Sequence, residues 1–342
     1  MTTPLATLTT LRVGGPADGL VTVSSAEQLV AAVKLSAELE QPILVVGGGS
    51  NLVISDRGFA GTAIVLRNRG ITATSRDDDT VRLAVESGEP WDEFVAWTIA
   101  QGFSGLEALS GIPGLVGATP IQNVGAYGQE VATYIDRVEA IHRYTGEQRT
   151  FTRDECVFGY RTSVFKQRKD VFVITRIHFT LQCSDLSAPI RYAELAQRLD
   201  VAVGDQAPAE VVRHVVLDVR RSKGMVLDES DHDTWSVGSF FTNPILGAAA
   251  ANSMPGNAPQ WEQADGRNKT SAAWLIEQAG FSKGYGAGAA RLSSKHVLAL
   301  TNHTGDATAV DIVELARTIR AGVESKFGIT LEPEPVLVGL EL

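Results

Sequence analysis

The sequence predicts a mixed α+β protein that contains more than one domain. Its 342 residues correspond to two or three domains of ordinary size, and 44% hydrophobic with 20% charged residues is typical of a folded globular chain. Helical and strand-like segments follow one another without regular β–α–β alternation, and the sequence has no internal repeat. The net charge of −10 disfavours binding to nucleic acid along a basic face, but it is compatible with a small anionic ligand held by local donors.

The first hundred residues predict two helices and a set of strands. Ser25 and Gln28 match the capping-box pattern that opens a helix, and Pro90 is expected in the first turn of a helix that runs to Gln101. Short apolar runs predict strands at 43–46, 52–54, 62–66, 71–74 and 81–86. The first two of these strands are separated by the loop Gly47–Asn51.

The remainder of the chain predicts a long loop, a strand-rich segment and three helices. Residues 102–128 are rich in Gly and Pro, residues 134–182 are rich in strand formers, and residues 335–342 are expected to form a strand. Helices are expected from Pro208 to about Arg221, over 270–279 and over 307–327, the last two ending at Gly280 and Gly328. In the last helix the residues expected to face the core are Val310, Val313, Ile319 and Val323.

Neither a metal centre nor a membrane anchor is expected. The two cysteines, Cys156 and Cys183, belong to no pattern with metal-ligand spacing, so a zinc site or a disulfide framework is unsupported. The N-terminus lacks a basic segment followed by an apolar one, and the longest uncharged stretches, 108–129 and 234–261, are interrupted by polar residues, Gly and Pro. These observations predict a cytoplasmic protein with no bound metal.

Two glycine-rich loops are candidates for binding a dinucleotide. In the first, Gly47–Asn51, glycines allow backbone N–H groups to converge on an anion, and Ser50 and Asn51 add side-chain donors; a plain tight turn is the alternative. The second, residues 110–128, is long and uncharged, so keeping it ordered is costly unless it wraps a ligand. A flexible lid is the alternative, although Ile112, Val116, Ile121 and Val124 favour packing.

The two loops, together with six other motifs in the same order, resemble the family of UDP-N-acetylenolpyruvoylglucosamine reductases. The resemblance is to the first structural type, which has a tyrosine loop over the substrate channel. The matching segments are Leu11–Pro16, Val46–Leu52, Ile112–Gly117, Gln122–Gly128, Phe158–Arg161, Gly238–Pro244, Ala264–Gly266 and Leu331–Glu334. Each motif alone is weak, but eight in the family's order make a specific signal.

The resemblance implies an FAD-binding fold of the vanillyl-alcohol-oxidase/PCMH type with two subdomains, and a third α+β domain that binds substrate. Residues 1–69 with 337–342 would form the first subdomain, 70–224 the second, and 225–336 the substrate domain, so the C-terminal strand would return to the first subdomain. It further implies a monomer that uses non-covalent FAD, NADPH as hydride donor, and a UDP-sugar as substrate. The cofactor-binding residues implied are Val46, Gly47, Gly48, Gly49, Ser50, Asn51, Leu52, Ser110, Gly111, Ile112, Pro113, Gly114, Gly117, Ala118, Ile121, Gln122, Asn123, Gly125, Ala126 and Tyr127.

Three reacting residues are implied by the same resemblance. Arg161 would stabilise negative charge on a carboxylate-bearing intermediate, although an arginine in an apolar strand segment usually extends to the surface. Ser239 would donate a proton, although the local sequence alone favours a turn hydroxyl. Glu334, held extended between two prolines, would stabilise the enolate, and only the family pattern favours it over Glu332.

For the UDP portion of the substrate, the resemblance implies the residues Tyr160, Tyr192, Lys223, Asn243 and Lys283. Ordinary surface or turn roles are the alternatives for each of them. Trp261 stands where family members often have Tyr, and Pro335 follows Glu334 where they often continue with Val-Arg. Two rival functions remain: another flavin-dependent oxidase or dehydrogenase on this fold, and a catalytically silent protein that binds nucleotide sugars.

Overall fold

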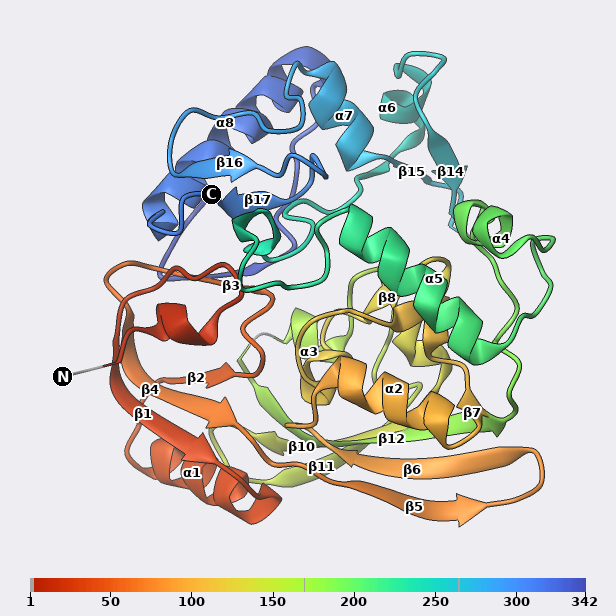
Figure 1. Cartoon of the computed structure of the whole chain (residues 1–342). Helices are drawn as coiled ribbons and strands as arrows, with labels where there is room; N and C mark the ends of the chain where they lie inside the picture. The colour runs from red at the N-terminus through yellow and green to blue at the C-terminus, as the bar shows by residue number, and fades with distance from the viewer. Residues whose placement is uncertain (1–2, 169, 264) are drawn as a thin grey trace. The chain divides into compact units, whose positions relative to one another are not determined.

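Non-consecutive stretches of the chain pack together in the computed structural model, which describes residues 3–168, 170–263 and 265–342 (Figure 1). The larger unit contains Ala17–Gly48 and Ala60–Val226. The C-terminal unit contains the stretch that ends at Pro16, Gly49–Phe59 and Leu227–Leu342. The three-part division expected from the resemblance stays a prediction, and Ala264 of the motif 264–266 lies outside the described residues.

One layer of the larger unit is a small sheet with a helix. Its strand order is β1 (Ala17–Val23), β4 (Phe59–Leu66), β2 (Ile43–Val46), and β2 runs parallel to β4. Helix α1 (Ala26–Glu38) begins at Ser25, whose side chain accepts the Gln28 N–H as predicted. The Gln28 carboxamide instead accepts from Ser24, so the reciprocal half of the capping box falls one residue earlier. Leu29, Val33 and Ile64 form the core of this layer.

An antiparallel sheet forms the rest of the larger unit's framework. Its strands run in the order β11 (Gln148–Thr152), β10 (Ile135–His142), β12 (Phe172–Cys183), β6 (Thr80–Glu86), β5 (Ile71–Arg76), with β7 (Phe103–Ser104) beside β12. The helices of this part, over the residues that the structure describes, are α2 (Trp91–Ala100), α3 (Val164–Gln167), α4 (Ala193–Leu199) and α5 (Ala209–Ser222). Phe94 of α2 packs on Phe179 of β12 with ring centroids 5.2 Å apart. Pro90 and Pro208 were expected in the first turn of their helices. They are instead the N-caps, so α2 and α5 begin one residue after each proline.

The second glycine-rich segment of the larger unit forms short elements rather than a featureless loop. They are the 3₁₀ turns η2 (Glu107–Leu109), η3 (Val116–Ala118) and η4 (Val131–Thr133), and the hairpin of β8 (Gly125–Ala126) with β9 (Gln129–Glu130).

The C-terminal unit is built from short strand pairs around its own apolar core. These are β3 (Leu52–Ile54) with β18 (Val336–Val338), β13 (Ile245–Leu246) with β15 (Asn268–Thr270) and β14 (Gln260–Glu262), and β16 (Ala290–Leu292) with β17 (Leu300–Asn302). Its helical elements are η1 (Leu5–Leu8), η5 (His232–Thr234), α6 (Ala248–Asn252), α7 (Ala272–Gln278) and α8 (Ala309–Phe327). Strand β18 runs parallel to β3, so the chain's end does return to the segment that follows the first glycine loop.

The predicted helix ends in this unit are confirmed, and one predicted core residue is wrong. Gly280 and Gly328 both have positive φ, at +99° and +65°. Val313, Ile319 and Val323 are buried, but Val310 is half exposed. Helix α8 starts two residues later than expected, behind a capping box of Thr308 and Asp311. Val310 points outward because, at 3.6 residues per turn, it lies on the face opposite Ile319. The C-terminal strand is also shorter than the expected 335–342.

Candidate functional site

The first glycine loop needs bare backbone on both sides of its path. A Cβ on Gly48 would stand 2.6 Å from the Cα of Gly114 in the second loop, closer than real side chains approach. A Cβ on Gly49, whose φ is +62°, would overlap the carbonyl oxygen of Leu8. In the larger unit the two loops therefore meet backbone to backbone. This close approach requires glycine at both positions, and a pyrophosphate site here stays a prediction.

The second loop is fixed by its own backbone bonds from residue 110 to residue 119. Trp91 N–H donates to the Gly114 carbonyl at 3.0 Å, and Gly117 N–H donates to the Ser87 carbonyl at 2.9 Å. Val116 is fully buried, while Ile121, expected to pack, is 38% exposed. Its carbonyl accepts the Ser163 hydroxyl, so this bond holds the backbone and leaves the side chain outside. The flexible-lid alternative is therefore wrong for this stretch.

An ion pair anchors the start of the second loop to two helices. The Asp92 carboxylate accepts a hydrogen bond from the Gly111 N–H. It also accepts hydrogen bonds from both terminal nitrogens of Arg213, at 2.6 and 2.9 Å. Burial opposes ionisation of Asp92, but the Arg213 and Gly111 hydrogen bonds outweigh it and lower the pKa of this carboxyl. The side chain is thus a permanent anion that holds Gly111 in place.

Arg161 lies in a tight turn and not in the strand segment expected from sequence. Gly159 and Thr162 exchange backbone hydrogen bonds around it, and its φ is +51°. A terminal guanidinium nitrogen of Arg161 donates to the Gly125 carbonyl at 2.9 Å. The Lys166 ammonium donates to the backbone carbonyl of Arg161 at 3.0 Å. The partly buried guanidinium is therefore directed against the hairpin β8–β9, which contradicts the surface-arginine alternative.

Left-handed backbone is concentrated around this turn. Asn123, Tyr127 and Arg161 all have φ near +50°. Such conformations cost about 1–3 kcal/mol each and persist where the surroundings impose them, often at functional sites. Buried Asn123 supplies part of that constraint, because its carboxamide donates to Glu130 and the Gly159 carbonyl and accepts from Ala132.

A cluster of two tyrosines and three charged residues follows the hairpin. Tyr192 is the N-cap of α4, is 42% exposed, and meets the ring of Tyr127 edge-on at 5.5 Å. The Lys223 ammonium forms an ion pair with the carboxylate of Glu194 in α4 at 2.9 Å. Burial raises the pKa of the Tyr127 phenol, although the positive charge of Arg220 opposes this shift. Burial in turn lowers the pKa of Arg220.

Arg220 and Glu194 are the site residues that sequence reasoning missed. A signal for Arg220 was present, since it follows Val216 by four residues and therefore shares the buried face of α5. Helix α4, which carries Glu194, was also missed, because a seven-residue helix gives too short an apolar pattern to recognise.

In the C-terminal unit, strand-like pairing joins the backbone of Glu334 to that of Phe240, the residue after Ser239. Glu334 N–H donates to the Phe240 carbonyl at 2.8 Å, and the neighbouring Thr242 N–H donates to Glu332. Phe240 is buried, which fixes the backbone next to the partly exposed Ser239. Glu332 is exposed whereas Glu334 is half-buried, so the structure itself favours Glu334 as the site residue.

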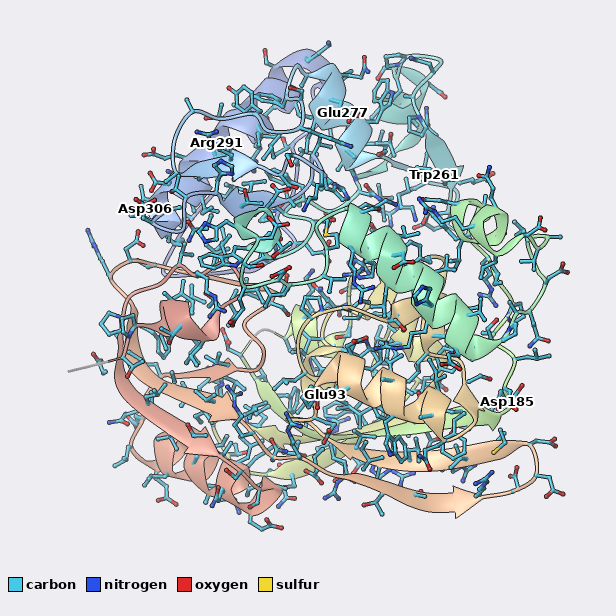
Figure 2. All side chains as sticks on the ribbon, in the orientation of Figure 1. Glu93, Asp185, Trp261, Glu277, Arg291 and Asp306 are labelled. Atoms are coloured by element: carbon cyan, nitrogen blue, oxygen red, sulfur yellow. The ribbon has the colours of Figure 1, made fainter. Side chains whose placement is uncertain are left out.

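The remaining substrate-side predictions fall in the C-terminal unit, except Tyr160. The Asn243 carboxamide accepts the N–H of Ala272 at 2.9 Å and so caps the start of α7. Lys283 is exposed, and so is Trp261 on β14 (Figure 2). Tyr160, in the larger unit, lies beneath the Arg161 guanidinium at 5.7 Å from its ring centroid.

The other predicted cofactor-binding residues lie in or next to the two loops. In the larger unit these are Val46, Gly47, Ser110, Ile112, Pro113, Ala118, Gln122 and Ala126. In the C-terminal unit they are Ser50, Asn51 and Leu52. Over the described ranges, no helix is long and apolar enough to cross a membrane, and no group of three His, Cys, Asp or Glu side chains is placed to hold a metal ion.

Comparison with known proteins decides the family. Residues 17–152 match the model of an FAD binding domain, and residues 228–338 match that of the UDP-N-acetylenolpyruvoylglucosamine reductase C-terminal domain. Proteins named UDP-N-acetylenolpyruvoylglucosamine reductase from Salinispora arenicola and Thermobifida fusca are each 52% identical over 99% of this chain, covering 95% and 98% of their own lengths. The chain belongs to the UDP-N-acetylenolpyruvoylglucosamine reductase family.

A solved reductase of this family, from Thermus caldophilus, matches with a TM-score of 0.68 and 26% identity over 99% of this chain and 98% of its own. The expected order of an FAD-binding domain followed by the family's C-terminal domain is thereby confirmed, with mixed helix and strand content. The chain itself, as a member of this family with an FAD-binding domain, is an FAD-dependent oxidoreductase.

Proposed function

We propose that the protein reduces the enolpyruvyl double bond of UDP-N-acetylenolpyruvoylglucosamine to give UDP-N-acetylmuramate, a peptidoglycan precursor, with NADPH as the source of hydride. The observation that carries this proposal is the hydrogen bond from Glu334 N–H to the Phe240 carbonyl. It joins two matching motifs of the family's C-terminal domain, one of which contains Ser239 and the other Glu334.

Arg161 is the cation of the proposed reaction. When bound, FAD supplies hydride to the terminal vinyl carbon of the substrate. Negative charge then develops on the substrate carboxylate as an enolate. The Gly159–Thr162 turn and the bond to the Gly125 carbonyl hold the Arg161 guanidinium before substrate arrives, so its charge acts without reorganisation. A planar guanidinium also matches a carboxylate in two-point contact.

Ser239 and Glu334 complete the proposed catalytic residues. The Ser239 hydroxyl is a weak acid, and it protonates the carbon next to the carboxylate because an enolate carbon is strongly basic. Glu334 stabilises the same enolate as a hydrogen-bond donor or through water. Its position next to a buried phenylalanine and between two prolines keeps its backbone stiff.

The UDP portion is assigned to the remaining residues. Tyr160, Tyr192, Lys223, Asn243 and Lys283 bind it, the lysines as point charges for the diphosphate. Asn243 already caps α7, so only its amide nitrogen is offered to substrate. The protein is proposed to act as a cytoplasmic monomer with non-covalent FAD.

The test is NADPH oxidation with and without UDP-N-acetylenolpyruvoylglucosamine, followed by mass spectrometry of the product made in deuterated water. We expect oxidation to depend on the UDP-sugar, with one solvent deuterium on the carbon that bears the carboxylate. NADPH oxidation at the same rate with and without the UDP-sugar would favour another flavin-dependent oxidase. A colourless protein that binds the UDP-sugar without turnover would favour a silent binding protein.

A further inference from the structure

Glu107 is a fully buried carboxylate that the proposed reaction does not use. It starts the turn η2 and has no exposed surface. One oxygen accepts the Gly105 N–H at 2.6 Å and the other accepts the Ala188 N–H at 2.5 Å. Burial raises the pKa of this carboxyl. A group so costly to bury is retained where its hydrogen bonds fix something specific.

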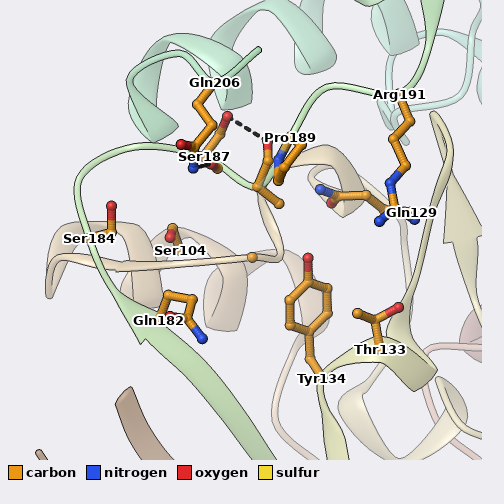
Figure 3. Close-up of a pocket in the computed structure, with 12 residues that line it drawn as sticks. Ser104, Gln129, Thr133, Tyr134, Gln182, Ser184, Ser187, Pro189, Arg191 and Gln206 are labelled. Carbon is orange, nitrogen blue, oxygen red and sulfur yellow. Dashed lines mark hydrogen bonds between the residues drawn. The ribbon is translucent and has the colours of Figure 1, made fainter. Parts of the chain in front are cut away.

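What Glu107 fixes is the segment 184–192, which has a cavity on one side. The cavity of about 340 Å³ is lined by polar side chains, among them Tyr134, Gln129 and Arg191 (Figure 3). Ala188 and Gly105, the two donors to Glu107, line it as well. Packing is incomplete on that side, so hydrogen bonds add to the packing of the buried Ile190 side chain in setting the position of the segment.

The other hydrogen bonds of this segment run mainly to the stretch that follows it in the chain. Ser187 N–H donates to the Ala207 carbonyl at 2.8 Å, and Ile190 N–H donates to the Asp205 carbonyl at 2.8 Å. The Gln206 side chain donates to the Ser187 carbonyl at 2.6 Å (Figure 3). Ile190 and Asp185 also accept from the N–H groups of Gly204 and Ala209, and Ser184 N–H donates to the Gly102 carbonyl. At Ala188, in the middle of the segment, Glu107 adds a bond to the turn that precedes the second glycine loop.

The segment ends at Tyr192, so the position of the segment backbone helps to determine where the Tyr192 ring lies. Arg191 packs against the hairpin, since a Cβ on Gly128 would stand 2.8 Å from the Arg191 Cβ. The next residue, Tyr192, meets Tyr127 edge-on. A shift at Ala188 therefore moves Tyr192 relative to the hairpin that also receives Arg161.

We infer that Glu107 is a positioning residue: its two backbone hydrogen bonds hold the segment 184–192 so that Tyr192 is placed for the UDP-sugar. This inference rests on the proposed function for its substrate. Glu107→Gln keeps the shape but turns one acceptor oxygen into an NH₂ donor that faces an N–H group. One of the two ties is therefore lost.

The test compares Glu107→Gln with Glu89→Gln, another buried glutamate, whose carboxylate accepts the Gly70 N–H. We expect amide hydrogen exchange over 184–192 to rise about tenfold in Glu107→Gln alone, with exchange over 110–119 and the FAD content unchanged. The KM for the UDP-sugar rises about tenfold in the same variant while kcat stays near that of the wild type.

Coupling to Tyr192 separates positioning from a general structural role. In a Tyr192→Ala background we expect Glu107→Gln to add nothing further to KM. Unchanged exchange over 184–192, or a KM effect that is fully additive with Tyr192→Ala, would overturn the inference. A wild type that does not turn over the UDP-sugar would overturn the proposed function instead, and the exchange measurement still tests the Glu107 tie.

Discussion

Residues 110–119 and residues 184–192 both carry predicted site residues of the larger unit, yet they are held by different contacts. The first stretch packs on the sheet core through Val116 and is bonded backbone to backbone at Gly114 and Gly117. The second has a cavity on one side, and in addition to its backbone bonds it is held by hydrogen bonds of the Glu107 and Gln206 side chains. A cofactor cradle benefits from rigidity, whereas a segment that covers a substrate must be able to move.

The difference is also a difference in stability. Segments with few buried apolar contacts open locally at low free energy, while core-packed segments open only with the whole unit. We therefore expect substitutions in the first stretch to affect FAD binding and the folded unit. Substitutions that loosen 184–192 are expected to affect local exchange and substrate KM.

The largest effect is expected from Gly48→Ala. The added methyl group would collide with the Gly114 backbone and force the two loops apart. Overpacking of about 1–3 kcal/mol corresponds to FAD binding weakened about 10- to 100-fold. The ratio of flavin to protein absorbance in the purified variant measures this loss.

Gly47→Ala is the matched control, because a Cβ there would make an ordinary 3.5 Å contact with Leu115. It should keep its flavin. Equal flavin content in the two variants would show that the approach of the loops does not shape the cradle.

A smaller effect on folding is expected from Asp92→Asn. The substitution leaves Arg213 and the Gly111 N–H with a weaker partner, which we expect to lower the free energy of unfolding by about 1–3 kcal/mol. Glu93→Gln on the same helix (Figure 2) is the control. Its pair with Arg69 is exposed and contributes about 0–1 kcal/mol. Urea denaturation of the three proteins compares them.

The Asp92 effect has a defined pH dependence. Since folding lowers the pKa of this carboxyl, its stabilisation is present above the ordinary aspartate pKa and is lost as the pH falls through the folded value. The difference between wild type and Asp92→Asn should be constant near neutral pH and shrink below about pH 4. A difference that grows on acidification would contradict the assignment.

The smallest effect is expected from Gln206→Ala. It removes one tie of the segment 184–192 and exposes the Ser187 carbonyl to the cavity. Exchange over 184–192 should rise by about two- to fivefold, with no measurable change in global unfolding. Gln182→Ala, at the same cavity but on β12, serves as the control. If Gln206→Ala destabilised the whole unit, the two stretches would not differ as described.

Local signals in the sequence predicted most elements. Ser25, Pro90 and Pro208 mark helix starts, and Gly280 and Gly328 mark ends, because capping and left-handed turns depend on neighbouring residues only. The exposure of Val310 was not predicted, because its apolar side chain was given more weight than the helical period, which places it opposite Ile319.

The site was less accessible to local reasoning. Glu334 lies beside Phe240 through a backbone pairing between segments far apart in sequence, and no local pattern encodes such a pairing. Arg161 was expected in a strand because its neighbours are apolar, yet the pairing of Gly159 with Thr162 makes a turn. In both cases the residue was recognised through the resemblance alone.

The most direct measurement is anaerobic stopped-flow of the flavin absorbance. The enzyme is reduced with one equivalent of NADPH and then mixed with UDP-N-acetylenolpyruvoylglucosamine, for wild type, Ser239→Ala and the neighbouring control Ser236→Ala. We predict fast reoxidation in wild type and control, slowed about 10²- to 10⁴-fold in Ser239→Ala. Reduced flavin that persists in wild type would contradict the proposed substrate, and equal reoxidation in all three proteins would contradict the role of Ser239 as the acid.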